Sequence, residues 1–290
     1  MIFFVLSILM YFIQDFSNKQ FCEYVENSSI GTALIQNSIC CICASATLTV
    51  TGRVDSIKLE MLPMALFFGI TYLGTVFLLL CAFMKGSMGI STLMCNIGMF
   101  IAAIYGIVRF KDGFTLFIAL GFVCMLIAVI LSTPTKEKGD RGGIKWFMLS
   151  LGSGLCNGIV ASVKREAVAI FGENTESFLA IAFLFAGLIA AAFAFAVKKN
   201  RGDAIAVIRR PLAMIFGVFA GIGTVLANLF QMRSLITVPS TVVYPMTSGI
   251  LVVSLWLASL LVYKETKAKA RNVMAVVMCV IAIVFVNITI

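Results

Sequence analysis

Polar side chains recur at helical spacing inside otherwise apolar stretches of this sequence. Residues three, four or seven positions apart share one face of a helix, so each group presents its polar atoms in one direction. Amides, hydroxyls and phenols form hydrogen bonds, and inside a membrane they face a partner helix or a watered cavity. The chemistry indicated is recognition of a small polar molecule. The groups are Tyr11, Gln14 and Asn18; Asn157 and Lys164; Asn228 and Gln231; and Tyr244, Thr247 and Ser248.

Small residues at the same spacing have a second interpretation, because serine, threonine and glycine also let transmembrane helices pack closely. Packing is the favoured interpretation for Ser7, Ser150, Ser153, Ser240 and the pair Gly217 and Gly221. The larger amides and Tyr244 are harder to explain in this way. For them, packing and a cavity both stay open.

Charged residues near these groups allow either a structural or a functional role. Lys19 and Lys164 occupy matched positions in two parts of the chain, so they could mark the two mouths of a pathway or reach toward lipid headgroups. Asp15 lies four residues before Lys19, a spacing at which the two charges can neutralise each other. Arg165 and Glu166 could do the same. Asp15 is the carboxylate we would test for proton coupling.

Residues needed for several other functions are absent or scattered. The chain has no histidine, which removes imidazole relays, Ser-His catalysis and most zinc sites. Its 13 carboxylates are dispersed, and Cys40, Cys41 and Cys43 have no metal-site spacing. The stretch GSGLCNG at Gly152–Gly158 lacks the Lys-Ser/Thr of a phosphate-binding loop. We predict no enzyme activity, no cofactor, no metal and no ATP-driven step.

Composition identifies a membrane protein. Of 290 residues 61% are hydrophobic, and the mean hydropathy is +1.07. The net charge of +9 comes from lysines and arginines between apolar runs, so we expect a lipid bilayer as partner and no nucleic acid. Continuous apolar runs predict an all-α integral membrane protein with ten transmembrane helices. The expected spans are roughly 1–21, 30–51, 61–83, 87–108, 113–132, 145–171, 175–197, 211–232, 238–263 and 268–289.

The two halves of the chain share a weak ordered repeat. Similar triplets recur with a shift that rises along the chain, as a few inserted residues would produce. They are SNK at 17–19 and SVK at 162–164, GTV at 74–76 and 223–225, and FKD at 110–112 and YKE at 263–265. We therefore expect two five-helix repeats, residues 1–135 and 143–290. Because five is odd, the second repeat would be inverted, which is typical of secondary transporters.

The distribution of positive charge predicts the sidedness. Connections after the odd-numbered spans hold fifteen lysines and arginines, against five after the even-numbered spans. The positive-inside rule then places the odd-numbered connections in the cytoplasm and both termini outside. We expect a protein integral to the plasma membrane, of the bacterial inner-membrane kind, acting as a monomer or weak homo-oligomer.

The ninth span carries a motif of Pro239, Tyr244, Ser248 and Gly249, followed by an apolar helix that ends near Glu265. With its halves and their inversion, the chain resembles the drug/metabolite transporter superfamily in its ten-helix EamA-like form. The motif is similar to one in the small multidrug resistance family. The resemblance implies a pathway lined by spans 1, 3, 4, 6, 8 and 9, with spans 5 and 10 packing the halves together. It also implies a substrate contact for Tyr244.

The chain departs from that small family at its most important position. The membrane-embedded glutamate of the family, which serves protons and cationic drugs, aligns near Tyr11 and Asn157 here. The motif is also absent from the first half, where its positions are held by Gly86, Ser91, Cys95 and Asn96. We include Asn96 in the expected substrate-binding set. We predict a secondary transporter for a small polar metabolite, with a lipid-linked-substrate flippase or a proton-coupled multidrug exporter as alternatives.

Overall fold

The computed structural model describes residues 2–25, 29–51, 54, 57–86, 88–113, 115–132, 143–263 and 270–287. Over these ranges the chain forms α-helices and one 3-10 turn joined by short connections, and these ranges contain no β-strand. The helices are α1 (Ile2–Val25), α2 (Ile30–Val50), α3 (Met61–Phe83), α4 (Met88–Asn96), α5 (Gly98–Phe110), α6 (Leu116–Ser132), α7 (Ile144–Phe171), η1 (Gly172–Asn174), α8 (Thr175–Ala196), α9 (Lys198–Ile208), α10 (Pro211–Thr237), α11 (Ser240–Leu261) and α12 (Ala270–Asn287).

Seven helical segments in the described ranges are long and apolar enough to cross a membrane. They are α2, α3, α4 with α5, α7, α8, α10 and α11. Shorter apolar helices run over Leu116–Ala128 in α6 and Val273–Ala282 in α12. Polar and charged residues in the second half of α1 lower its hydropathy. The chain is therefore an integral membrane protein with seven candidate spans.

Each apolar segment expected from the sequence forms a helix, and the fourth is divided into α4 and α5. The charged stretch after the seventh segment was expected to be a loop, and this was wrong, because it forms α9. Ala204 and Val207 of α9 are buried, and the helix packs against α2 and α8. The two buried residues are too few to stand out in a stretch dominated by lysine, arginine and aspartate.

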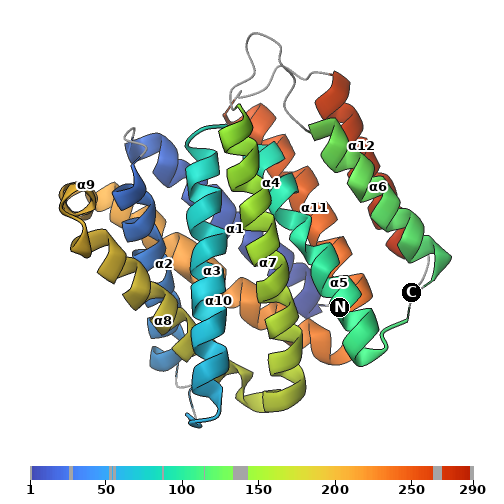
Figure 1. The fold of residues 1–290 in the computed structure, drawn as a ribbon, viewed down its shortest axis with the longest axis horizontal. Coiled ribbons are helices and arrows are strands. Elements are labelled where there is room, and N and C mark those ends of the chain that lie inside the picture. Colours follow the sequence, from blue (N-terminus) through green and yellow to red (C-terminus); the bar gives the residue numbers. More distant parts are fainter. Residues whose placement is uncertain are drawn as a thin grey trace.

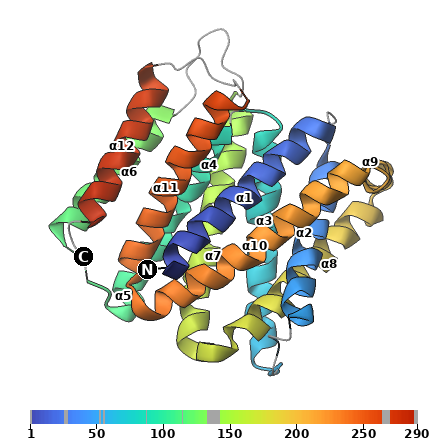
Figure 2. The same ribbon diagram turned by 180° about the vertical axis from the view of Figure 1, so that it is seen from behind.

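The helices run up and down between two ends of the bundle. In Figures 1 and 2, α1, α3, α6 and α11 finish toward the upper end, whereas α5, α7 and α10 finish toward the lower end. Several charged residues used to predict the sidedness lie outside the described ranges. They are Arg53, Lys136, Lys138, Arg141, Lys264, Lys267 and Lys269, together with Glu265 of the ninth-span motif and the boundary between the expected repeats.

Helices distant in sequence form the closest pairs. α1 runs along α10, α3 along α7, α2 along α8, and α6 along α12 (Figure 2). Glycines allow part of this proximity. A Cβ added to Gly158 of α7 would lie 2.5 Å from the carbonyl oxygen of Gly98 in α5, and one added to Gly221 of α10 would lie 2.6 Å from that of Cys40 in α2. The packing interpretation of GSGLCNG and of the Gly217–Gly221 pair agrees with these contacts.

The break between α4 and α5 leaves a polar position inside the bundle. α4 ends at Asn96 and α5 begins at Gly98. Carbonyls in the last turn of a helix lack intrahelical partners, and here the side-chain amide of Asn157 donates to the Cys95 carbonyl at 3.2 Å. The break thus sets Cys95 and Asn96 against α7.

Candidate functional site

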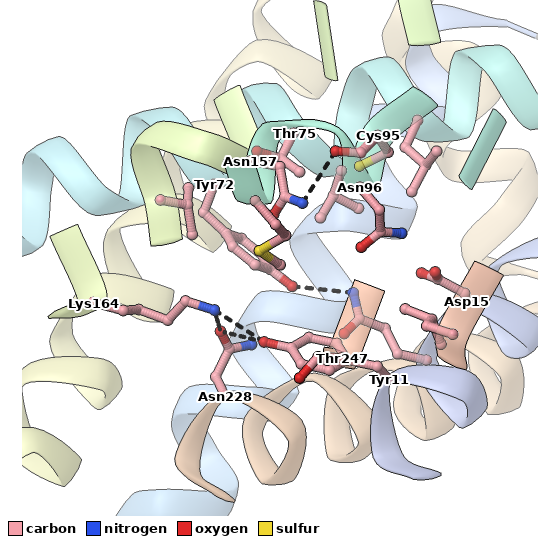
Figure 3. A pocket seen from close by; sticks show the side chains of 16 residues that line it. Tyr11, Asp15, Tyr72, Thr75, Cys95, Asn96, Asn157, Lys164, Asn228 and Thr247 are labelled. Carbon is pink, nitrogen blue, oxygen red and sulfur yellow. Dashed lines mark hydrogen bonds between the residues drawn. The ribbon is translucent and has the colours of Figure 1, made fainter. Parts of the chain in front are cut away.

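A cavity lies inside the bundle, where α1, α3, α4, α5, α7, α10 and α11 converge (Figure 3). The space around these walls that holds no protein atom, open solvent included, is about 510 Å³. Its wall is partly polar and partly apolar, and it is built from residues Tyr11, Gln14, Asp15, Tyr72, Thr75, Val76, Leu79, Cys95, Asn96, Met99, Asn157, Val160, Lys164, Asn228, Thr247 and Leu251. Both halves of the chain contribute.

Lys164 forms one side of this cavity. Only 1% of the residue is exposed. Its ammonium group donates to the Tyr11 hydroxyl at 3.0 Å, to the Asn228 side-chain oxygen at 3.1 Å and to the side-chain oxygen of Gln231. All three N–H bonds are used, and all three acceptors are neutral. Hydrogen bonds therefore solvate the charge, but none of these partners neutralises it.

The same acceptors are linked to one another through Tyr11. Its hydroxyl lies 2.9 Å from the Gln231 oxygen and 3.2 Å from the Asn228 oxygen. Asn228 also donates to the Thr224 carbonyl one turn earlier, at 2.8 Å. These bonds hold the two amide oxygens toward the ammonium group. The α1 and α10 side chains are thereby oriented before any ligand arrives.

Asp15 stands on the opposite side of the cavity from Lys164 in Figure 3. The residue is 6% exposed. Within the described ranges its carboxylate makes no hydrogen bond and no ion pair. The neutralisation of Asp15 by Lys19 was wrong, since Lys19 pairs with Glu23 at 2.8 Å and donates to the Phe83 carbonyl at 3.2 Å.

Between these two charges the wall carries neutral polar groups. Gln14 donates its side-chain amide to the Tyr72 hydroxyl at 3.3 Å, and Tyr72 donates to Thr224 at 3.3 Å. Asn96 donates to the Thr92 carbonyl in its own helix at 2.9 Å. Its side-chain oxygen therefore remains available as an acceptor. Thr75, Asn157 and Thr247 add further polar groups, and apolar side chains fill the remaining wall.

Seven residues of the expected set line this cavity: Tyr11, Gln14, Asn96, Asn157, Lys164, Asn228 and Thr247. Four others lie outside its wall. Asn18 accepts a hydrogen bond from Gln36 of α2 at 3.1 Å, and Gln231 lies behind Lys164. Tyr244 is fully buried and donates to the Ala161 carbonyl of α7 at 2.6 Å, while the buried hydroxyl of Ser248 has no partner in the described ranges.

Two polar wall residues of α3 were not predicted from the sequence. Tyr72 and Thr75 lie on α3 within the stretch GITYLGTVF, which reads as an apolar span. Their spacing of three places them on one helix face, and this was the signal that could have identified them. Cys95 was considered only as an aligned position. It joins the wall because α4 ends one residue later.

The charged residues after Lys164 belong to a different region. Arg165 pairs with Asp112 at 3.2 Å and donates to the Leu235 carbonyl at 3.0 Å. Glu166 accepts from Arg109 at 3.1 Å and from the Tyr105 hydroxyl at 2.9 Å. The expected pairing of Arg165 with Glu166 was therefore wrong. Both residues instead tie the end of α7 to neighbouring helices.

Comparison with known proteins gives the fold and no family. No protein-family model and no curated protein sequence matches the chain. A solved structure titled "Crystal structure of protein" is similar over 99% of this chain and 97% of its own, with a TM-score of 0.61 and 11% sequence identity. The arrangement of helices therefore occurs in at least one other protein, and its title names no activity.

Proposed function

We propose that this protein is a secondary transporter that moves a small polar metabolite across the membrane by alternating access. In this proposal it has ten spans arranged as two inverted five-helix repeats, as in the drug/metabolite transporter superfamily. The observation that carries it is the cavity, because helices from both halves contribute polar side chains to its wall. Substrate sites of such transporters lie between the repeats, near the middle of the membrane.

Helix packing supports the repeat. In an inverted arrangement α1 corresponds to α7, α3 to α10, α2 to α8 and α6 to α12. The contact of α1 with α10 is then equivalent to that of α7 with α3, and both are extensive. The pairs α2 with α8 and α6 with α12 would each join equivalent helices across the axis. The helices that line the cavity are also those that the family resemblance implies.

The break between α4 and α5 supports a substrate site at this depth. Interrupted helices expose backbone polar groups, and in membranes these occur where the backbone is buried in protein or lines a cavity. Cys95 and Asn96 on one side of the break and Met99 on the other line the cavity. A ligand in the cavity would therefore lie next to the polar groups of the interruption.

A proton-coupled multidrug exporter is a second candidate, because Asp15 lines the cavity without an ion-pair partner. Lys164 weighs against cationic drugs, since a second positive charge in a buried site is repelled. The remaining alternative, a flippase for a lipid-linked substrate, needs a passage for an apolar tail between helices. A small polar molecule fits the polar groups of the wall better.

Transport in proteoliposomes tests the proposal. Purified protein should take up at least one compound from a panel of labelled amino acids, nucleobases and sugars, down the compound's gradient and without ATP. Asn228→Ala should reduce that uptake, because it removes an acceptor from Lys164. Asn200→Ala, on α9 away from the cavity, is the matched control. A requirement for ATP, or equal uptake by both variants, would contradict the proposal.

Sidedness is tested separately by placing a cysteine at position 199. In intact cells, Lys199→Cys should resist a membrane-impermeant maleimide that reacts after the cells are opened. This outcome follows from a cytoplasmic connection after α8. Labelling of intact cells above the level of the parent protein would place α9 outside and reverse the proposed topology.

A further inference from the structure

Two buried ionisable side chains of opposite type line the cavity, Lys164 of α7 and Asp15 of α1. Lys164 and Asp15 face the same space from opposite sides (Figure 3), yet no ion pair joins them. Removing a charge from water is costly unless a counter-charge is supplied. The Lys164 side of the cavity therefore lacks a negative charge, and the Asp15 side lacks a positive charge.

Buried side-chain amide groups without a hydrogen-bond partner lie near both residues. Beside Lys164, the side-chain N–H groups of Gln231 are buried and have no acceptor. Beside Asp15, the side-chain oxygen of Gln14 is buried and has no donor. The amide orientations follow from their partners, because the Gln231 oxygen accepts from Lys164, and the Gln14 amide donates to Tyr72. The Asp15 side of the cavity thus lacks a donor, while the unpaired N–H groups of Gln231 lie behind Lys164 and outside the wall.

We propose that the substrate is a small zwitterion, bound with its carboxylate toward Lys164 and its ammonium group toward Asp15. A carboxylate supplies the negative charge that Lys164 lacks and takes the place of one of its three neutral acceptors, while an ammonium group donates hydrogen bonds and neutralises an aspartate. A ligand with one charge would leave the other charge of the site unbalanced. This inference rests on the proposed transport function and specifies the substrate class of the same cavity.

Helix geometry separates the two recognition points. Tyr11 and Asp15 are one turn apart on α1, a rise of about 6 Å along the axis. Lys164 reaches the hydroxyl of Tyr11 at 3.0 Å. The ligand spans from that level to the level of Asp15, while Thr75 and Asn96 border the space between them. Val76 and Met99 supply apolar wall for an aliphatic portion of the ligand to contact.

Binding to the full-length protein purified in detergent tests the inference by calorimetry. The probes are glycine, 3-aminopropanoate, 4-aminobutanoate, 5-aminopentanoate and 6-aminohexanoate, each compared with the amine and the carboxylate of equal chain length. At least one zwitterion should bind about tenfold or more tightly than both of its singly charged counterparts. Its chain length reports the distance between the two recognition points. Equal binding of the amine or of the carboxylate, or no binding by the whole series, overturns the inference.

Two substitutions assign the two ends. Asp15→Asn should weaken the zwitterion about tenfold and leave the matched carboxylate unchanged, and Lys164→Gln should do the converse for the matched amine. Glu60→Gln and Lys58→Gln remove exposed charges of the same signs and are the controls. The change in preference requires a folded site, so unfolding cannot produce it. If Lys164→Gln does not fold, Asp15→Asn and the charge-retaining Lys164→Arg decide the matter. Loss of zwitterion and carboxylate binding together in Asp15→Asn contradicts the assignment.

The outcomes separate this inference from the proposed function. Zwitterion binding without uptake in proteoliposomes would remove the transport function and keep the ligand class. Uptake of a nucleobase or sugar, with no zwitterion bound, would keep transport and remove the ligand class. The two experiments therefore fail independently.

Discussion

Lys164 and Arg165 are consecutive residues of one helix, yet the protein treats their charges in opposite ways. Arg165 has a carboxylate partner in Asp112, with side-chain exposures of 17% and 8%. Lys164 is more deeply buried and meets oxygen atoms of neutral groups. Successive helical residues point about 100° apart, so one faces the cavity and the other the neighbouring helices.

The difference separates a structural charge from a functional one. Asp112 also accepts from the backbone N–H of Ser240 at 2.9 Å, so α5, α7 and α11 are tied together by groups that the protein itself supplies. The site of Lys164 is hydrogen-bonded but electrically incomplete. A charge that the fold leaves unbalanced is suited to a partner that arrives and departs.

The largest expected effect is on transport and comes from substituting Lys164. Lys164→Met should lower transport of the panel substrate about 100-fold, because the ligand loses its charged partner in a buried site. Stability should change by about 1 kcal/mol or less, since the lost desolvation cost offsets the lost hydrogen bonds. Uptake and thermal melting of the same preparation measure the two quantities. A large loss of stability would make Lys164 a structural residue and erase the contrast.

The next largest effect is on stability and comes from removing the counter-charge of Arg165. Asp112→Asn should lower the free energy of unfolding by about 2 kcal/mol, between the values for exposed and buried ion pairs, because Arg165 loses its counter-charge. Unfolding of the purified protein in mixed detergent micelles measures this. Binding of the panel substrate to the folded fraction should stay unchanged. A loss of affinity without a loss of stability would show that the Asp112 network belongs to the substrate site.

The sequence predicts this architecture well where apolar length and polar breaks decide it. The helical segments follow from the apolar runs, and α9 escaped prediction because two buried residues are too few to form a pattern. Helical spacing also predicts a polar face, and seven of the expected residues line one cavity. Whether they contact a substrate stays a prediction.

The sequence could not predict which residues of a polar helix face reach the cavity. Asn18 follows Gln14 by one turn and leaves the cavity for α2, whereas Ser248 follows Thr247 by one residue and turns away from it. Charge partners were also beyond the sequence. Arg165 pairs with Asp112 across 53 positions, so neighbours such as Glu166 were mistaken for its partner. Local spacing predicts which helix face a side chain shares. Only the tertiary fold determines whether that side chain reaches the cavity and which residue it pairs with.

A smaller effect sharpens the comparison with two tyrosines. Tyr11→Phe removes the hydroxyl that accepts from Lys164, so substrate affinity should fall roughly fivefold, the worth of about 1 kcal/mol. Tyr244→Phe removes the bond to the Ala161 carbonyl and should cost about 1 kcal/mol of stability with affinity unchanged. Calorimetry and melting curves on both variants measure these changes. If Tyr244→Phe is the one that weakens binding, the substrate contact implied by the family resemblance applies and the cavity described here is incomplete.

The smallest effect concerns Lys19, the residue matched to Lys164 in the first half. Its ammonium lies 2.8 Å from Glu23, whose side chain is 55% exposed, and 5.6 Å from the centre of the Tyr263 ring. Lys19 is buried, but Glu23 lies in solvent that screens the pair, and Lys19 keeps its hydrogen bond to the Phe83 carbonyl. Glu23→Gln should therefore change stability by less than about 1 kcal/mol and leave transport unchanged. Melting curves and uptake by the variant measure both. A marked loss of uptake would mean that the pairing of Lys19 controls the pathway. The two matched lysines would then share one role, and the imbalance at Lys164 would no longer distinguish the site.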